Sequence, residues 1–367
     1  MANTKAVNFA EIKANEGVPY AKPVQILDND GNVVNEELMA NFSDELLVDL
    51  MKKMVWARAL HEQTMSFSKQ GRLGFYAPTW GEEASEMGTA AAFKKQDFLF
   101  PAYRDLPQLI QHGATVAQMY LWSKGHIKGN LFDARALRPQ IIIGAQMVEM
   151  AGGALGIKKN GEKDTVAYAY TGEGGSSQGD TYEGMNFAGA FQVPGVFIIQ
   201  NNGWAISFPR KLQTETQTIA QKAVAAGIPG VQVDGMDVLA CYEVAKEARE
   251  FAAGNGPVLI ETLTYRFGAH SSAGDDPTRY RTEDETKPWF DKDPLIRLRK
   301  YLTKKGLWSE EEEQKYADEC KQSFKEAMKE ADSVEPEKVS DMLKRTFEVP
   351  TPDIKEQIKK YEEKESK

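Results

Sequence analysis

The central part of the chain alternates between short apolar runs and amphipathic stretches. Buried strands are predicted at Gln140–Ile143, Thr165–Thr171, Val196–Gln200, Val231–Val233 and Val258–Thr264. Helices are predicted around them at Gly81–Phe93, Ala114–Ser123, Gly144–Lys158, Asp180–Phe191 and Leu239–Phe251. Because strands that alternate with helices form parallel sheets, this pattern predicts an α/β fold, with a doubly wound, mostly parallel sheet and helices on both faces.

The two ends of the chain differ from this centre. The first 40 residues are polar and are expected to be extended. A helix is predicted to begin at Ser43, because apolar residues then recur at helical spacing from Leu46 to Val55. After Pro288 the chain is expected to be helical. We therefore expect an N-terminal arm at 1–40, an α/β domain at 41–288 and a charged helical region packed on it at 289–367.

Charge supports this division. Only three of the 41 residues from Thr165 to Ala205 are charged, against 41 of the 84 from Asp284 to Lys367. The first segment is therefore expected to be buried on nearly all sides, and the second to form helices that face solvent.

Composition narrows the class of protein. The 367 residues are 41% hydrophobic and 27% charged, a globular balance that excludes wholesale disorder. The net charge of −9 argues against binding to nucleic acid backbones. No apolar run approaches the roughly 20 residues of a membrane span, and the N-terminus has no secretory signal. The two cysteines form no disulfide framework, so a cytoplasmic location is expected.

The strongest chemical signal follows two successive predicted strands. Gly172-Glu173-Gly174 ends the first, and after 26 further residues Asn201-Asn202 ends the second. Ligands of parallel sheets bind at the carboxyl ends of the strands. A carboxylate and a carboxamide oxygen can share one hard cation, whose remaining sites then take diphosphate oxygens and water. The backbone amides of Gly174–Ser177, which lead into a helix, predict an anion cradle.

This pair of motifs resembles the thiamine diphosphate motif, in which GDG is followed by NN. The likeness extends to GRLGFYAPTWGEEA (Gly71–Ala84), PAYRD (Pro101–Asp105), QIIIGAQ (Gln140–Gln146), GGSSQGDTYEGMNFAGAF (Gly174–Phe191) and HSSAGDDPTRYR (His270–Arg281). From about residue 25 to the C-terminus, the chain is similar to alpha subunits of the E1 component of 2-oxo acid dehydrogenase complexes. Among these, it is most similar to the bacterial pyruvate dehydrogenase members.

The resemblance implies a set of binding residues. It assigns Mg²⁺ to Glu173, Asn202 and the backbone carbonyl of Trp204. It assigns thiamine diphosphate to Tyr103, Arg104, Ile143, Gly172, Gly174, Gly175 and Asn202. Arg104 suits the diphosphate because a guanidinium can bind phosphate oxygens in bidentate fashion. Glu173 stands where the family normally has Asp, so either the loop retreats or the metal site is weaker or prefers Mn²⁺ or Ca²⁺.

Several titratable residues are candidates for proton transfer. The chain has four histidines, and His270 lies in the predicted loop Phe267–Asp276, where an imidazole can act as acid or base. His126 is a second candidate at the entrance of the site. Asp180 and Glu183 share one helix face and either complement the helix dipole or, as the resemblance implies, relay a proton between two active sites. The other two histidines, His61 and His112, are expected to be packing or helix-surface residues.

The resemblance implies oxidative decarboxylation of pyruvate, a small 2-oxo acid, with acetyl transfer to the lipoyl group of an E2 acyltransferase. The carboxylate that activates the aminopyrimidine is not found in this chain. In the family it comes from a beta subunit, so an α2β2 heterotetramer is expected, with no role for nucleic acid or membrane. Two alternatives stay open: a branched-chain 2-oxo acid or acetoin dehydrogenase alpha subunit, and a non-catalytic subunit of the same fold.

Overall fold

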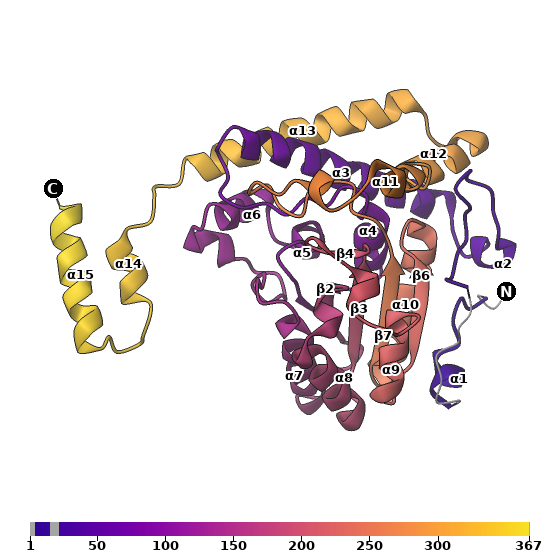
Figure 1. The fold of residues 1–367 in the computed structure, drawn as a ribbon, viewed down its shortest axis with the longest axis horizontal. Helices are drawn as coiled ribbons and strands as arrows, with labels where there is room; N and C mark the ends of the chain where they lie inside the picture. The colour runs from indigo at the N-terminus through magenta and orange to yellow at the C-terminus, as the bar shows by residue number, and fades with distance from the viewer. Residues whose placement is uncertain (1–3, 15–21, 367) are drawn as a thin grey trace.

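A computed structural model describes residues 4–14 and 22–366. In these ranges, five strands form a parallel sheet in the order β1-β2-β3-β7-β6, and two more form an antiparallel hairpin (Figure 1). The sheet strands are β1 (Phe98–Phe100), β2 (Ala167–Gly172), β3 (Gly195–Asn201), β6 (Gly230–Asp234) and β7 (Val258–Leu263). The hairpin strands are β4 (Trp204–Ala205) and β5 (Phe208–Pro209). The predicted α/β class with a parallel sheet is confirmed.

Helices surround this sheet and continue beyond it. The helices up to the last sheet strand are α1 (Phe9–Ala14), α2 (Glu36–Met39), α3 (Asp44–Lys69), α4 (Glu83–Ala91), α5 (Leu106–His112), α6 (Val116–Ser123), α7 (Ala145–Lys159), α8 (Gly179–Phe191), α9 (Lys222–Ala225) and α10 (Val238–Asn255). The later helices are α11 (Glu283–Phe290), α12 (Pro294–Lys305), α13 (Glu310–Asp332), α14 (Val339–Lys344) and α15 (Pro352–Glu365). Short 3₁₀ turns include η1 (Ile127–Asn130), η2 (Gly175–Ser177), η3 (Arg210–Leu212), η4 (Ile219–Gln221) and η5 (Pro277–Arg279).

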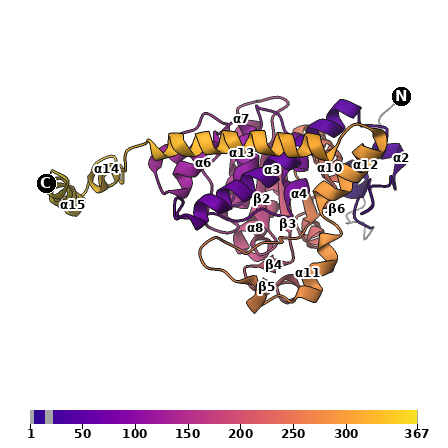
Figure 2. The same cartoon turned by 90° about the horizontal axis from the view of Figure 1, so that it is seen from above.

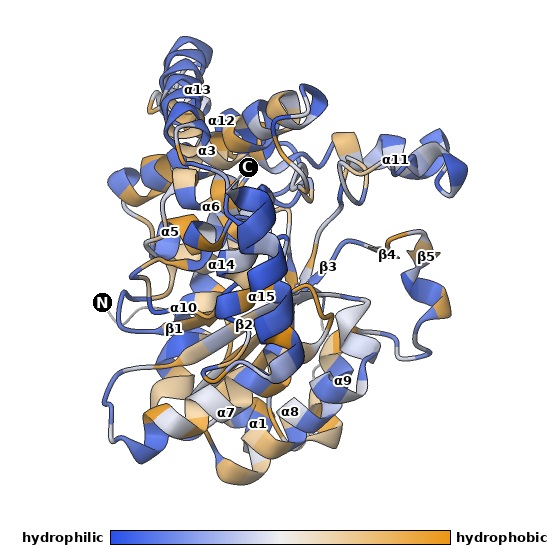
Figure 3. Cartoon of the chain, turned by 90° about the vertical axis from the view of Figure 1, so that its left-hand side faces the viewer, coloured by the Kyte–Doolittle hydropathy of each residue, from blue (hydrophilic) through white to orange (hydrophobic). Residues whose placement is uncertain are grey.

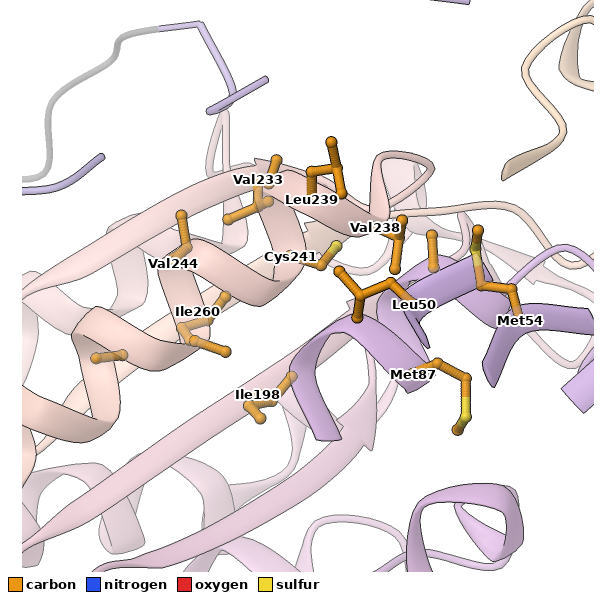
Figure 4. Close-up of a cluster of buried hydrophobic side chains, with 14 of the residues drawn as sticks. Leu50, Met54, Met87, Ile198, Val233, Val238, Leu239, Cys241, Val244 and Ile260 are labelled. Carbon is orange, nitrogen blue, oxygen red and sulfur yellow. The ribbon is translucent and has the colours of Figure 1, made fainter. Parts of the chain in front are cut away.

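The sheet is buried on both faces. Successive strand residues point to opposite faces, so Val196 and Ile198 of β3 enter one core while Phe197 and Ile199 enter the other. The first core includes α3, α4 and α10, and Figure 4 shows Ile198 in the same apolar cluster as Leu50 of α3. The second core includes α7, α8 and α9. Burial on both sides explains why the strands read as continuous apolar runs instead of alternating patterns.

Segments from elsewhere in the chain cover both edges of the sheet. Val24 forms a parallel bridge to β6, and next to it the backbone N–H of Ile26 donates to Oδ2 of Asp237 at 2.7 Å. At the opposite edge, Ala136 forms a bridge to β1. The predicted arm at 1–40 thus includes a segment that pairs with the sheet, together with α1 and α2, which are helical rather than extended. Residues 1–3 and 15–21 of that arm lie outside the described ranges.

The C-terminal helices differ in how they contact the body. α13 runs along α3 and α6 and buries Phe324 and Met328 (Figure 2). α14 and α15 pack on each other and project away from the sheet (Figure 1), and α15 is largely hydrophilic (Figure 3). None of the residues of α15, all of them described, is buried. Within the described chain, no helix combines the length and apolar character needed to cross a membrane.

The predicted strand at Gln140–Ile143 is wrong. Only Gln140 forms a bridge, to Ala102, and the segment then leaves the sheet, so that Ile141 and Ile142 are 65% and 67% exposed. An isoleucine run predicts burial, but within residues 4–14 and 22–366 no strand pairs with this segment. The three-residue strand β1, which the pattern did not indicate, forms that edge of the sheet instead.

Candidate active site

A cavity lies at the carboxyl ends of β2 and β3, where the sequence predicts a ligand. The strand register pairs Gly172 with Gln200, so Glu173 and Asn202 follow on neighbouring strands. The cavity is lined by the predicted residues Tyr103, Arg104, Ile143, Gly172, Glu173, Gly174, Gly175, Asn202, Trp204 and His270. The structure therefore gathers most of the candidate residues in one place.

The turn after β2 is packed so closely that two of its glycines leave no room for a side chain. A Cβ at Gly175 would lie 2.0 Å from Oγ1 of Thr171, and a Cβ at Gly174 would lie 2.7 Å from Cβ of Ala205. Gly172 is different, since a Cβ there would meet only a carbonyl oxygen at 4.0 Å. Glycine thus permits the tight turn at 174–175 and leaves open space at 172.

Fewer backbone amides are available for an anion than the four predicted at Gly174–Ser177. The N–H of Ser176 donates to the carbonyl of Glu173 at 3.1 Å, and that of Ser177 to the carbonyl of Gly174 at 3.2 Å. These bonds close the turn η2 and use two of the four amides. The amides of Gly174 and Gly175 are the ones left to face an anion.

Glu173 is 1% exposed, and burial raises its pKa to about 7. The nearby charge of Glu82 also raises this pKa, while hydrogen bonds from Gln213 and from the backbone of Asn202 oppose the shift. A buried carboxyl with this pKa is only partly ionised near neutral pH. A divalent cation beside it would favour the charged form.

Asn202 is held between two partners that define the orientation of its carboxamide. Its Nδ2 donates to Oε1 of Glu82 at 3.0 Å, and its Oδ1 accepts from the N–H of Trp204 at 3.1 Å. The amide nitrogen is thus engaged, and the oxygen keeps a lone pair for a cation. With the Glu173 carboxylate and the Trp204 carbonyl, these are hard oxygen donors of the kind that Mg²⁺ takes, so the residues present fit this metal.

A metal site in this cavity would need carboxamide and backbone oxygens as ligands in addition to carboxylates. Among the described residues, no group of three or more His, Cys, Asp or Glu side chains is arranged to hold a metal. A cation here would depend on the mixed donors of this cavity and on oxygens of a bound ligand.

Arg104 fixes the proton arrangement on His270. One guanidinium nitrogen donates to the carbonyl of Pro78 at 2.5 Å, and the other lies 3.1 Å from Nδ1 of His270. Because a guanidinium only donates, Nδ1 must be the acceptor and the proton of the neutral ring lies on Nε2. Burial, then the charges of Arg104 and Arg266, lowers the pKa of His270 to about 4, so the ring is neutral at physiological pH.

Hydrogen bonds order the loop that carries His270. Oδ2 of Asp275 accepts from the backbone N–H of His270 at 2.5 Å and from the hydroxyl of Tyr280 at 2.7 Å. Arg281 donates to the carbonyls of Phe267 and Gly268 at 3.1 and 3.0 Å. The loop is held by contacts to its own backbone, which places the imidazole firmly at the cavity wall.

Comparison with known proteins identifies the family of this chain. Residues 51–340 match the family described as Dehydrogenase E1 component. The chain belongs to this family. Two relatives named "Pyruvate dehydrogenase E1 component subunit alpha" match over the full length of both chains: one from Staphylococcus epidermidis is 53% identical over 371 residues, and one from Staphylococcus aureus is 54% identical over 371 residues. The resemblance inferred from the sequence motifs is confirmed.

Three of the candidate residues of this dehydrogenase E1 chain lie outside the cavity lining. His126 caps the turn η1 with Nδ1 and has Nε2 3.2 Å from the carbonyl of Glu335. Asp180 and Glu183 are exposed in the first two turns of α8. The chain alone therefore does not bring these three residues to the cofactor end of the cavity.

The remaining histidines pack away from the cavity. The Nδ1 of His61 accepts from the N–H of Thr79 at 3.4 Å, and burial lowers the pKa of His61 to about 3. His112 is half-buried and lies 3.0 Å from the hydroxyl of Tyr168. Both placements agree with the packing roles expected for them.

Two buried acids that the sequence patterns did not indicate also line the cavity. Glu82 contacts Asn202, as described above, and Asp105 accepts from the N–H of Ala102 at 2.7 Å and from the Gln200 amide at 2.9 Å. Burial raises the pKa of Asp105 to about 7. Both acids lie in quoted motifs, Gly71–Ala84 and Pro101–Asp105, but the signal for Glu82 was weak, because Gly81-Glu82-Glu83 at the start of a predicted helix is also the pattern of ordinary first-turn acids.

Proposed function

We propose that this dehydrogenase E1 chain is the alpha subunit of a pyruvate dehydrogenase E1 component, which decarboxylates pyruvate oxidatively and passes the acetyl group to a lipoyl group of E2. The observation that carries the proposal is the convergence of Glu173, Asn202 and Arg104 on one cavity at the strand ends. The names of the full-length relatives support pyruvate as the substrate.

The residues of the cavity divide into cation and anion ligands. Glu173, the Asn202 oxygen and the Trp204 carbonyl would hold Mg²⁺. The diphosphate would bind to Tyr103, Arg104 and the amides of Gly174 and Gly175, with Gly172 leaving space and the Ile143 backbone near the aminopyrimidine. Bound thiamine diphosphate supplies the carbon nucleophile and electron sink that decarboxylation of a 2-oxo acid requires.

His270 would hold a proton at Nε2. Because Arg104 occupies Nδ1, the ring presents Nε2–H as a donor to the substrate oxygen that gains charge during the reaction. The low pKa keeps the ring from becoming a second cation beside Arg104. Arg104 would therefore act twice, on the diphosphate and on the tautomer of His270.

A beta subunit would complete the site in an α2β2 assembly. Exposed apolar residues lie at or next to the cavity lining: Ile206 belongs to the lining, and Ile141 and Ile142 directly precede the lining residue Ile143. Exposed apolar patches are typical of subunit interfaces. The partner would contribute the carboxylate that activates the aminopyrimidine. Asp180 and Glu183, exposed on α8, are free to join a proton relay across that interface, and His126 would lie nearer its entrance.

The test uses the full-length chain co-expressed with a beta-type subunit. Calorimetry measures thiamine diphosphate binding with and without Mg²⁺, and a dye acceptor follows turnover of pyruvate, branched-chain 2-oxo acids and acetoin. We expect Mg²⁺-dependent binding and a preference for pyruvate, with at least a tenfold loss of affinity in Glu173→Ala. The exposed residue Glu215, which lies outside the cavity, provides the control Glu215→Ala.

The Glu173→Asp variant separates the remaining alternatives. If neither wild type nor this variant binds the cofactor, the catalytic proposal is wrong. Binding by the Asp variant alone would indicate a decayed, non-catalytic site. Faster turnover of branched-chain substrates or acetoin than of pyruvate would assign the chain to one of those dehydrogenases instead.

A further inference from the structure

Glu82 is a buried acid of the cavity lining, and the sequence analysis assigned no role to it. It occupies the N-cap position of α4 but its side chain makes no capping bond. The residue is 1% exposed and lines the cavity beside Asn202. A buried carboxylate that does not cap its helix needs another reason to be there, because its burial costs free energy.

The two oxygens of Glu82 have different surroundings. Oε1 accepts the hydrogen bond from Nδ2 of Asn202 at 3.0 Å. Oε2 is buried without a hydrogen-bond partner among the described residues and lies 3.8 Å from Nε of Arg104. One side chain thus reaches both a candidate metal ligand and the candidate diphosphate ligand.

The bond to Oε1 has a consequence for Asn202. A carboxylate only accepts, so it selects the nitrogen end of the carboxamide and turns the oxygen end away from itself. The Trp204 N–H on the other side selects the same orientation, because it can only donate to an oxygen. Without Glu82, a single backbone contact would hold the carboxamide.

We propose that Glu82 is a positioning residue that holds the Asn202 oxygen toward the cation, an inference that rests on the metal and cofactor assignment above. Partners that orient metal ligands typically contribute a factor of about 10 to 100 in metal affinity. The effect of Glu82 therefore depends on its reach to Asn202 more than on its charge.

Two conservative variants separate reach from charge. Glu82→Gln keeps the chain length and can accept from Asn202 through its amide oxygen. Glu82→Asp keeps the charge but is one methylene too short to maintain the 3.0 Å contact. The control pair, Glu215→Gln and Glu215→Asp, makes the same changes at an exposed site outside the cavity.

The measurement is Mn²⁺ affinity, followed by electron paramagnetic resonance of free Mn²⁺ in the presence of thiamine diphosphate, with the chain assembled with its beta subunit. We expect Glu82→Asp to weaken Mn²⁺ binding at least tenfold and Glu82→Gln to stay within about threefold of wild type. Thermal unfolding of each variant confirms that it is folded. In an Asn202→Ala background, Glu82→Asp is expected to have no further effect, because the positioned group is gone.

Each outcome decides one of the two proposals. Absence of thiamine diphosphate-dependent Mn²⁺ binding in wild type contradicts the proposed function. If wild type binds and Glu82→Asp binds equally well, Glu82 does not position the ligand. A loss of Mn²⁺ affinity in Glu82→Gln without a loss in Glu82→Asp would show that charge, rather than reach, is what the cation requires, and would overturn the inference.

Discussion

The inner end of the cavity and its mouth are built in opposite ways. At the inner end, Glu82, Glu173 and Asn202 are all less than 10% exposed and each has a defined partner. The mouth is the exposed part of the lining: Ile206 is 54% exposed, and Ile142, next to the lining residue Ile143, is 67% exposed. The chain thus buries the ionisable part of the cavity by itself and leaves the apolar part exposed.

The difference follows from what supports each end. Glu173 and Asn202 stand at the tips of adjacent strands, so the sheet register determines their separation. The segment around Ile142 leaves the sheet after one bridge, and no neighbouring strand fixes it. The arrangement of the buried polar residues is therefore set within one chain, whereas the exposed mouth is suited to a surface that another chain completes.

The largest effect is expected at the turn of the inner end. Gly175→Ala would place a methyl group 2.0 Å from Oγ1 of Thr171, and we expect it to lower the free energy of unfolding by about 3 kcal/mol. Gly172→Ala is the matched control, since its methyl group meets no close atom. Urea denaturation measures both. Equal stability of the two variants would mean that the turn is looser than the structure indicates.

The second-largest effect is expected at His270, which also lines the cavity. Folding lowers its pKa from 6.5 to about 4, so acidification through that interval protonates the unfolded chain first and reduces stability. Arg104→Met removes one cause, and the pKa of His270 should rise but stay below 6.5 because burial remains. The stability lost on acidification should be correspondingly smaller in this variant.

Nuclear magnetic resonance of labelled imidazoles measures this pKa in both proteins. A wild-type value near 6.5 would contradict the burial of the site. An unchanged value in the Arg104→Met variant would show that the charge of Arg104 does not contribute to the lowered pKa of His270.

The smallest effect is expected at the mouth, and it has the opposite sign. Ile206 adopts φ +57°, a left-handed conformation that β-branched residues avoid. Ile206→Asn should raise the free energy of unfolding by about 1 kcal/mol, because asparagine tolerates this conformation. The control Ile142→Asn changes an equally apolar, exposed residue and should stay within about 0.5 kcal/mol of wild type. Destabilisation by Ile206→Asn in denaturant titrations would show that its packing outweighs the strain.

The sequence was sufficient to predict the strands and site residues where an apolar run in the sequence is also buried in the structure. The strands β2 and β3 are mostly apolar runs, and β7 begins with one at 258–260. The residues at the tips of β2 and β3 are short motifs with a direct chemical interpretation. The strand prediction at Ile141–Ile143 was wrong for a physical reason. An apolar run indicates that its side chains avoid water, but it does not indicate whether the same chain or another chain covers them. Glu82 could not be predicted, because its contact with Asn202 joins residues 120 positions apart.

The pairing of the N-terminal segment with the sheet edge affects how this chain folds during its synthesis. Ile26 bonds to Asp237, a partner 211 residues further along. On the ribosome, the N-terminal segment emerges long before β6 exists, and must remain unpaired until most of the domain has been synthesised. Such non-local contacts slow folding and expose strand edges meanwhile. Because β6 joins the sheet through β7, we expect this edge to close only after translation has passed Leu263.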